Sequence, residues 1–179
     1  MGLPGLPPNM RNIADRNGGI NSVYPCTEYL TFGPWIYMVP QYPPESVLML
    51  GYAGGTTAGL IRLFYGDVPI TAVDLEFVED PYGSTFVQAD AQEYVRDCSF
   101  FDCIIVDVFE SKDPTPPSFV FSEAFVADVT SKCNYLIVDA MEDSDMSAYD
   151  HLHKVKTLAL NRSRFYYFMV NRVARLPIR

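Results

Sequence analysis

Residues 47–59 read VLMLGYAGGTTAG, an apolar run that ends in a cluster of glycines and is followed at once by an amphipathic segment. This order is typical of a buried strand, a tight turn and the start of a helix. Gly51, Gly54 and Gly55 carry no side chains, so the backbone of this turn can approach a ligand closely. The N–H groups at the start of the helix would point at the same place. The stretch therefore predicts a strand–turn–helix unit with a binding site at the turn.

A second apolar run, ITAVD, follows this unit and ends on Asp74. Nucleotide-binding strand–helix–strand units place an acid at this spacing, where it binds ribose hydroxyl groups. The pair of signals favours a nucleoside ligand. The alternative is that the glycines only allow the helix to pack closely on the sheet.

The remaining sequence alternates between strand-like and helical patterns. Strands are expected at 47–50, 70–76, 86–90, 101–109, 134–140, 164–170 and 172–178. Helices are expected at 57–65, 91–97, 122–131 and 146–160, the last because Ala148, Leu152, Val155 and Ala159 recur at helical spacing. Asn171 alone joins the last two strands, which makes them antiparallel neighbours. The predicted fold is single-domain α/β, a mostly parallel, Rossmann-like seven-stranded sheet with a C-terminal antiparallel hairpin.

The chain divides by composition near residue 45. Residues 1–20 are rich in proline and glycine and are expected to form an irregular arm. Residues 23–43 are rich in aromatic side chains, which could wall a pocket but more often pack on a core. We therefore expect an N-terminal arm and aromatic cap at 1–45 and a ligand-binding domain at 46–179.

Composition excludes several classes of protein. Of 179 residues, 49% are hydrophobic and 20% charged, which suits a globular core. The net charge of −9 would repel a nucleic-acid backbone, so no nucleic-acid partner is expected. No segment resembles a signal peptide or a membrane span, which predicts a cytoplasmic protein without a membrane partner. The four cysteines show no metal-binding spacing and are expected to be reduced and structural: Cys26, Cys98, Cys103 and Cys133.

An acidic stretch follows the expected strand at 134–140. Asp139, Glu142, Asp143 and Asp145 could attract a polycation or a metal ion, but a solvated loop before the helix at 146–160 accounts for them more simply. His151 and His153 would lie within that helix on different faces. We therefore predict no metal site.

In their order these motifs resemble the class I S-adenosylmethionine-dependent methyltransferase fold, and within it the spermidine synthase-like branch. VLMLGYAGGTTAGL is similar to the glycine motif of that branch, with Ala53 in place of one glycine. TAVDLEFVED resembles its acidic second-strand motif, and FVQADAQEYV followed by FDCIIVDVFE resembles the two motifs that come next.

The resemblance implies a donor, S-adenosylmethionine (SAM) or its decarboxylated form, and a set of residues that bind it. Asp74 would hold the ribose hydroxyls, Asp90 would contact the adenine amino group, and Asp107 would lie beside the reacting sulfonium. The implied donor-binding residues are Gly51, Ala53, Gly54, Gly55, Asp74, Leu75, Asp90, Ala91 and Asp107. Taken without the resemblance, Asp74 and Asp90 could simply cap strand ends and helix starts.

The implied catalytic residues are Asp107 and one acid in the loop that follows it. Asp107 could accept a proton from an incoming amine. Spermidine synthases use a second acid in a similar loop to hold the diamine. Strand register assigns this role to Glu110 and the Asp-Pro pair assigns it to Asp113, so both stay candidates, and both could also be solvated loop acids.

The function implied by the resemblance is transfer of an aminopropyl or methyl group to a small, cationic acceptor, with a polyamine as one candidate. The alternative is a non-catalytic nucleoside-binding or interaction protein that keeps the fold. A homodimer is one option for its assembly, because the aromatic residues of 24–42 or the C-terminal hairpin could cover a second copy.

Overall fold

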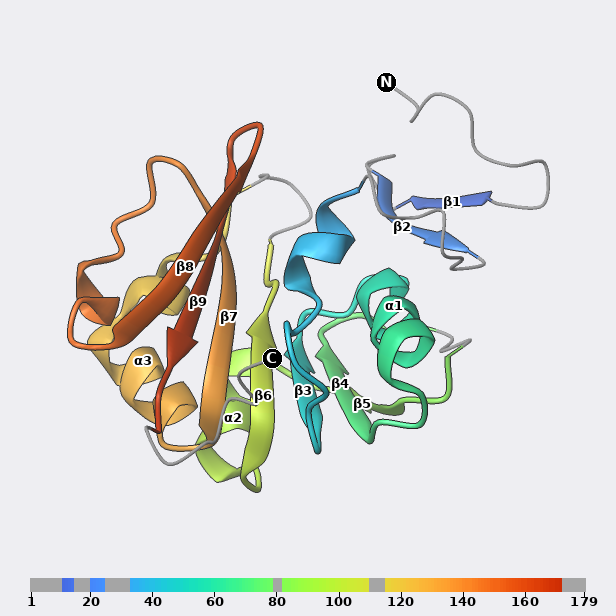
Figure 1. The fold of residues 1–179 in the computed structure, drawn as a ribbon, viewed down its shortest axis with the longest axis horizontal. Coiled ribbons are helices and arrows are strands. Elements are labelled where there is room, and N and C mark those ends of the chain that lie inside the picture. Colours follow the sequence, from blue (N-terminus) through green and yellow to red (C-terminus); the bar gives the residue numbers. More distant parts are fainter. Residues whose placement is uncertain (1–10, 15–19, 25–32, 79–81, 110–114, 172–179) are drawn as a thin grey trace.

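A seven-stranded sheet with the order β5-β4-β3-β6-β7-β9-β8 forms the centre of a computed structural model that describes residues 11–14, 20–24, 33–78, 82–109 and 115–171 (Figure 1). The strands are β3 (Val47–Leu50), β4 (Ile70–Asp74), β5 (Thr85–Gln88), β6 (Phe101–Val106), β7 (Cys133–Met141), β8 (His153–Leu160) and β9 (Ser163–Met169). Strands β5, β4, β3, β6 and β7 pair in parallel, and β9 is antiparallel to both β7 and β8. The predicted fold class is confirmed.

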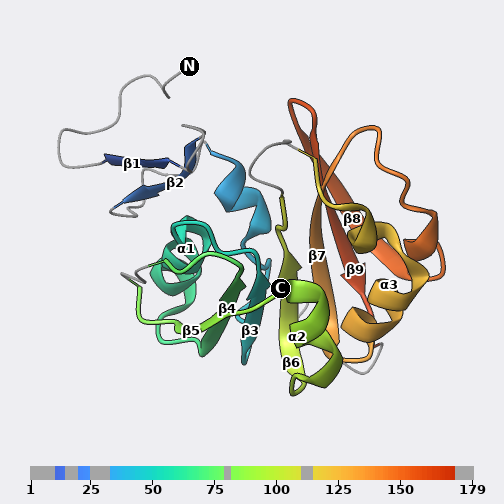
Figure 2. The ribbon, with the colours of Figure 1, turned by 180° about the vertical axis from the view of Figure 1, so that it is seen from behind.

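Helices cover both faces of this sheet. The α-helices are α1 (Thr56–Tyr65), α2 (Ala91–Asp97) and α3 (Glu123–Thr130), and the short 3-10 helices are η1 (Pro34–Met38), η2 (Ser118–Phe121) and η3 (Ser147–Tyr149). Helices α2 and α3 lie on the face turned toward the viewer in Figure 2, whereas α1 and η1 lie on the other (Figures 1 and 2). The three α-helices confirm the helices predicted at 57–65, 91–97 and 122–131.

Side chains of each strand point alternately to the two faces of the sheet, so the core consists of two layers. Met49, Ile105 and Ile137 belong to the cluster that packs against α1 and η1. Their chain neighbours, such as Leu50 and Ile104, belong to the cluster that packs against α2 and α3. Successive residues of β3, β6 and β7 are thus buried on opposite faces, which explains their nearly unbroken apolar sequences. Within the described residues, Cys98, Cys103 and Cys133 are buried free thiols, as expected, whereas Cys26 lies outside them.

The helix predicted at 146–160 is wrong. Residues Ser147–Tyr149 form only the short helix η3, and His153–Leu160 form the edge strand β8. The helical spacing arose because Ala148 and Leu152 pack beside the α2/α3 core before the strand begins, while Val155 in the strand is 50% exposed. An edge strand needs few buried residues, so its apolar pattern is a weak signal.

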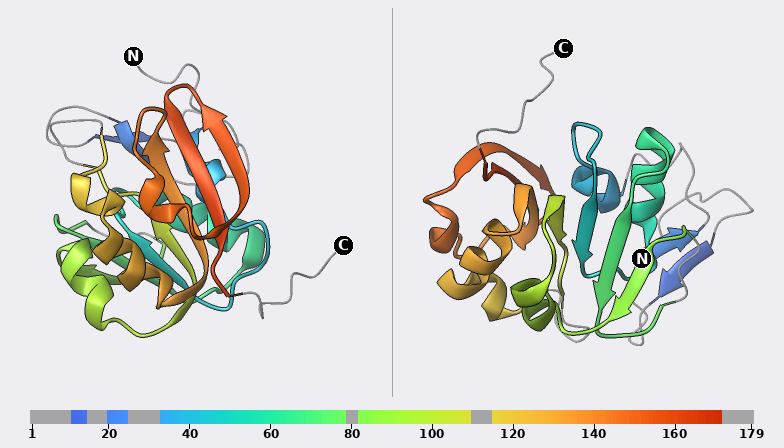
Figure 3. Two further views of the ribbon diagram at one scale, coloured as in Figure 1. Left: turned by 90° about the vertical axis from the view of Figure 1, so that its left-hand side faces the viewer. Right: turned by 90° about the horizontal axis from the view of Figure 1, so that it is seen from below.

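The hairpin lies earlier in the chain than predicted. Its strands are β8 and β9, which pair from His153 opposite Met169 to Leu160 opposite Ser163 (Figure 3, left). The turn uses Asn161, whose φ of 54° is left-handed and suits asparagine better than most residues. The strand predicted at 172–178 lies outside the described residues, and β8 supplies the seventh strand instead.

The N-terminal region contains more regular structure than expected. β1 (Arg11–Ala14) and β2 (Ile20–Tyr24) pair as an antiparallel two-stranded sheet beside α1 (Figure 1). Among the described aromatic residues of 23–43, Trp35 is buried, Tyr37 stacks on Phe165 and Tyr42 packs on Tyr135, so core packing is their main contribution. None of the helices in the described part of the chain is both long and apolar enough to span a membrane.

Candidate functional site

The glycine turn after β3 forms the centre of the candidate site. Gly51 has a φ of 85°, and a Cβ atom there would overlap the carbonyl oxygen of Asp107, so only glycine allows β3 and β6 to approach at this point. Gly55, with a φ of 77°, is the N-cap of α1 and offers no side chain to the first turn of the helix. The start of α1 therefore has no side-chain cap, and the positive end of its helix dipole faces the turn.

Ala53 adopts a conformation that glycine would adopt more easily. Its φ is 49°, in the left-handed region, at the position where the resembled motif carries glycine. Because the side chain is a single methyl group, the turn keeps its shape. The backbone path predicted for this motif is therefore present in spite of the substitution.

Asp74 organises this turn. Its Oδ2 accepts the backbone N–H groups of Tyr52, at 2.9 Å, and of Ala53, at 3.0 Å, and its Oδ1 accepts that of Glu76 at 3.1 Å. The carboxylate at the end of β4 therefore fixes the loop that follows β3. Two carboxylate oxygens offer about four acceptor positions, so a further donor can still bind.

Asp90 is the N-cap of α2. Its Oδ1 accepts the backbone N–H groups of Gln92, at 2.7 Å, and Glu93, at 3.2 Å. The capping role that the sequence left open is thus present. Both bonds use Oδ1, so Oδ2 can still accept a hydrogen bond from a ligand.

The two residues next to these acids differ in exposure. Leu75 is 64% exposed, and Phe77 nearby is 73% exposed. Ala91, in contrast, is buried in the first turn of α2. An exposed apolar side chain beside a strand-end acid is suited to contact a flat, apolar ligand surface such as a nucleobase.

Tyr52 is a structural residue of the site that the sequence analysis did not single out. A Cβ on Gly55 would overlap the Tyr52 ring, and the Tyr52 hydroxyl lies 3.4 Å from Ser84 Oγ. The ring also makes an edge contact with Phe86, with 5.9 Å between the ring centroids. Tyr52 therefore connects the glycine turn to β5. It occupies a position of the glycine motif that varies in residue type, so the motif gives no signal for such a role.

Asp107 follows β6 directly and lies next to the turn. Its backbone N–H donates to the carbonyl of Leu50 at 2.8 Å, which aligns it with the end of β3. Burial raises the pKa of Asp107 well above its usual range, and the nearby carboxylates of Asp139 and Asp74 raise it further. The strands β3 and β6 meet where the chain order of the sheet reverses, the place where open α/β sheets bind ligands.

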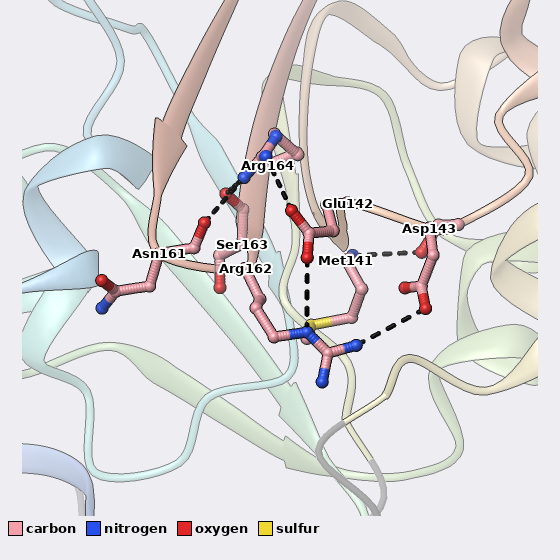
Figure 4. A network of polar contacts seen from close by, with 8 residues as sticks. Met141, Glu142, Asp143, Asn161, Arg162, Ser163 and Arg164 are labelled. Atoms are coloured by element: carbon pink, nitrogen blue, oxygen red, sulfur yellow. Dashed lines mark hydrogen bonds and ion pairs between the residues drawn. The ribbon is translucent and has the colours of Figure 1, made fainter.

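The acidic stretch after β7 separates into two parts. Asp139 is not a loop residue, because it lies within β7 and is 5% exposed. Glu142 and Asp143 lie beyond the strand and pair with Arg162 of the hairpin turn and Arg164 at the start of β9 (Figure 4). Arg164 Nη2 donates to Glu142 Oε2 at 3.0 Å, and Arg162 contacts both acids at 3.5 Å. The interpretation of this stretch as one solvated loop before a helix was wrong.

Several other predicted residues lie away from the described site. Glu110 and Asp113 fall outside the described residues. His151 lies in the turn before β8, and His153 is its first residue; both are exposed. In the parts of the chain that the structure describes, no three His, Cys, Asp or Glu side chains are placed to hold a metal ion.

Two small cavities, each of about 60 Å³, lie elsewhere on the sheet. One is lined by Tyr42, Tyr135 and Tyr167 among other residues, and the other by Tyr149, Lys154 and Tyr166 among others. Neither is lined by Asp74, Asp90 or Asp107, so the candidate site is defined by the strand ends and not by these cavities.

Comparison with solved structures supports the fold at low sequence identity. Human Methyltransferase-like protein 13, in complex with S-adenosylhomocysteine (SAH), is similar over 80% of this chain and 82% of its own, with 16% identity and a TM-score of 0.61. A structure described as a probable spermidine synthase, from Corynebacterium glutamicum, covers 69% of this chain and 55% of its own length, with 15% identity and a TM-score of 0.53. The sequence matches no protein-family model and no curated protein. The chain thus has the fold of SAM-dependent methyltransferases.

Proposed function

We propose that the chain is a SAM-dependent transferase that binds its donor across the carboxyl ends of β3, β4, β5 and β6. One observation carries this proposal. Asp74 is the last residue of β4, Asp90 and Asp107 follow the ends of β5 and β6, and the glycine turn after β3 lies among them. The sheet has the fold of a human methyltransferase-like protein that was solved with SAH. This arrangement offers acceptors for a nucleoside at the edge where such sheets bind ligands.

The residues fit the parts of such a donor. Asp74 would accept from the ribose hydroxyls with the acceptor positions that its three backbone bonds leave. Asp90 Oδ2 would accept from the adenine amino group, and Leu75 would pack on the base. Gly51, Ala53, Gly54 and Gly55 would leave room for the donor beside the start of α1.

Methyl transfer fits this site better than aminopropyl transfer. The first turn of α1 has neither a side-chain cap nor an acidic residue, so its N–H groups and positive dipole end favour an anion. SAM carries a carboxylate that its decarboxylated form lacks. When bound, SAM supplies an electrophilic methyl group on a sulfonium.

Asp107 would act on the acceptor side of this reaction. It would hold the acceptor nitrogen in line and take a proton from its ammonium form before the attack, because only the neutral amine has the lone pair that forms the new bond to the methyl carbon as the thioether leaves. Burial and the neighbouring acids Asp139 and Asp74 raise the pKa of Asp107, which makes its ionised form more basic than an exposed carboxylate. The acceptor in this proposal is a small molecule with an amino group.

The variant Asp90→Asn tests the proposal, because it separates capping from ligand binding. Asparagine caps helices about as well as aspartate, so the free energy of unfolding should change by less than about 0.5 kcal/mol. The amide N–H₂ group that replaces Oδ2 would face the adenine amino group, donor against donor. Calorimetric titration with SAH should therefore show affinity about 10-fold weaker, or 1.4 kcal/mol.

The control for this experiment is Asp97→Asn, at the far end of the same helix α2, which removes an equal charge. SAH should bind this control as it binds the unchanged protein. Equal affinity in the Asp90 variant and the control would show that Asp90 only caps α2.

A further inference from the structure

Asp139 is a buried acid without an evident structural role. It lies in β7, is 5% exposed, and its Oδ1 has no hydrogen-bond partner among the described residues. Burying a carboxylate without a partner is unfavourable, because the group loses its hydration. Such a residue, between the apolar Val138 and Ala140, suggests a ligand that supplies the missing donor.

Strand register places Asp139 beside Asp107. Val106 of β6 pairs in parallel with Val138 of β7, so the residues that follow them are neighbours on adjacent strands. Strands in a sheet lie about 4.8 Å apart, and side chains at matching positions point to the same face. That face carries Ile105 and Ile137 and is covered by α1 and η1. The two carboxyl groups therefore lie side by side at the carboxyl edge of the sheet.

The surroundings of this pair are apolar and aromatic. Phe165 of β9 lies opposite Asp139 in the antiparallel ladder and is fully buried. Tyr37 of η1 stacks on Phe165, with 5.2 Å between the ring centroids. Rings of this kind offer an apolar wall that can accommodate the carbon chain of a ligand.

No cation of the described chain neutralises the pair. Arg164, which lies opposite Ala140 next to Asp139, pairs with Glu142, and Arg162 pairs with Glu142 and Asp143 (Figure 4). None of the ion pairs found between described residues includes Asp107 or Asp139. The charged groups that act on Asp107 are Asp139 and Asp74, and both are acids.

We propose that Asp139 and Asp107 together form the acceptor subsite, and that they bind one protonated amino group at the end of an apolar chain. The ammonium group donates to Oδ1 of Asp139 and to the Asp107 carboxylate, and the chain packs toward Phe165 and Tyr37. This inference rests on the proposed function for its place in the reaction, because the subsite lies next to the turn that would hold the donor.

An ammonium group suits this pair for two reasons. It carries one positive charge and three donors, so it can satisfy both carboxylates at once. Burial raises the pKa of both acids, so each holds a proton more readily than an exposed carboxylate does, and a cation beside them would favour their ionised forms. A divalent metal ion would need further ligands, and the described residues do not bring a third one to it.

The experiment is an NMR titration of the full chain with n-butylamine hydrochloride, in the presence and absence of SAH. n-Butanol, which has the same carbon chain and no charge, is the ligand control. The unchanged protein is compared with Asp139→Asn and with Asp143→Asn, an exposed acid that lies beyond the same strand. The amide signals of residues 137–141 and 165 report binding at the subsite.

We expect n-butylamine, and not n-butanol, to shift these signals in the unchanged protein and in Asp143→Asn. In Asp139→Asn the affinity should fall at least 10-fold while SAH binding is unchanged. Equal amine affinity in all three proteins, or stronger shifts with magnesium chloride than with the amine, would overturn the subsite. If SAH binds none of them but the amine still requires Asp139, the donor proposal fails and the amine site stands.

Discussion

The variant Gly51→Ala is expected to destabilise the protein by about 3 kcal/mol or more, because two separate costs add. The φ of Gly51 is 85°, a conformation that alanine adopts only with strain. The new Cβ would also overlap the carbonyl oxygen of Asp107. This carbonyl cannot easily move, because the N–H of Asp107 donates to Leu50 and the N–H of Gly51 donates to Val73. Chemical denaturation monitored by circular dichroism measures this decrease in the free energy of unfolding.

Gly83→Ala is the matched control for this variant. Gly83 has a similar φ of 72°, but a Cβ there would have no atom within 4 Å. The free energy of unfolding of Gly83→Ala should therefore fall only by the cost of the left-handed backbone conformation, about 1 kcal/mol. Equal losses in the two variants would contradict the close approach of β3 and β6 at the candidate site.

The variant Asp139→Asn is expected to stabilise the protein at pH 8 by about 2–4 kcal/mol, since one pKa unit corresponds to about 1.4 kcal/mol. Burial raises the pKa of Asp139 from 3.8 to about 7 in the folded chain. Between these two values the folded state binds more protons than the unfolded state, so stability falls as the pH rises. The stability that proton binding by Asp139 contributes is fully present below about pH 4 and is lost as the pH rises through 7.

Asparagine does not titrate, so the pH dependence of the difference identifies its cause. Thermal unfolding at pH 4, 6 and 8 should show that the stability gained by Asp139→Asn over the unchanged protein is near zero at pH 4 and grows as the pH rises. Asp143→Asn should change stability by less than about 0.5 kcal/mol throughout, because its partner Arg162 and the acid itself are exposed. A less stable Asp139→Asn at pH 8 would show that the carboxylate has a partner in the folded chain.

The parts of the fold that the sequence predicted are those with strong local signals. The run 47–50, the glycines after it and the acids at 74, 90 and 107 combine periodicity with turn chemistry, and the structure places them at one edge of the sheet. Helix α2 begins where Asp90 supplies its cap, as a strand-end acid before a helical pattern predicts.

The errors fall where local signals are weak or shared by two structures. Residues 153–160 have apolar positions that fit a helix, and only pairing with β9 makes them a strand. Asn171 and Asn161 are both plausible turn residues, and the position of the hairpin is decided by which strand covers β7. Pairing between distant segments is not encoded in the periodicity of either one.

Asp139 was misplaced for a different reason. Its sequence neighbours Glu142, Asp143 and Asp145 made it look like the start of an acidic loop. The informative signal is the repeat of Val-Asp at 106–107 and 138–139, because β6 and β7 pair in parallel with Val106 opposite Val138, which makes the two aspartates neighbours. Comparing strand ends across a predicted sheet would have found the pair.

The most direct test of the account is an NMR titration of the full chain with SAH that identifies where the nucleoside binds. The account predicts saturable shifts at Gly51, Ala53, Gly54 and Gly55 and at the backbone of Asp74 and Asp90, with residues at the opposite end of the strands unchanged. A folded protein that shows no shifts at millimolar SAH, or shifts only around the cavities at Tyr42 and Tyr149, would contradict the proposed donor site.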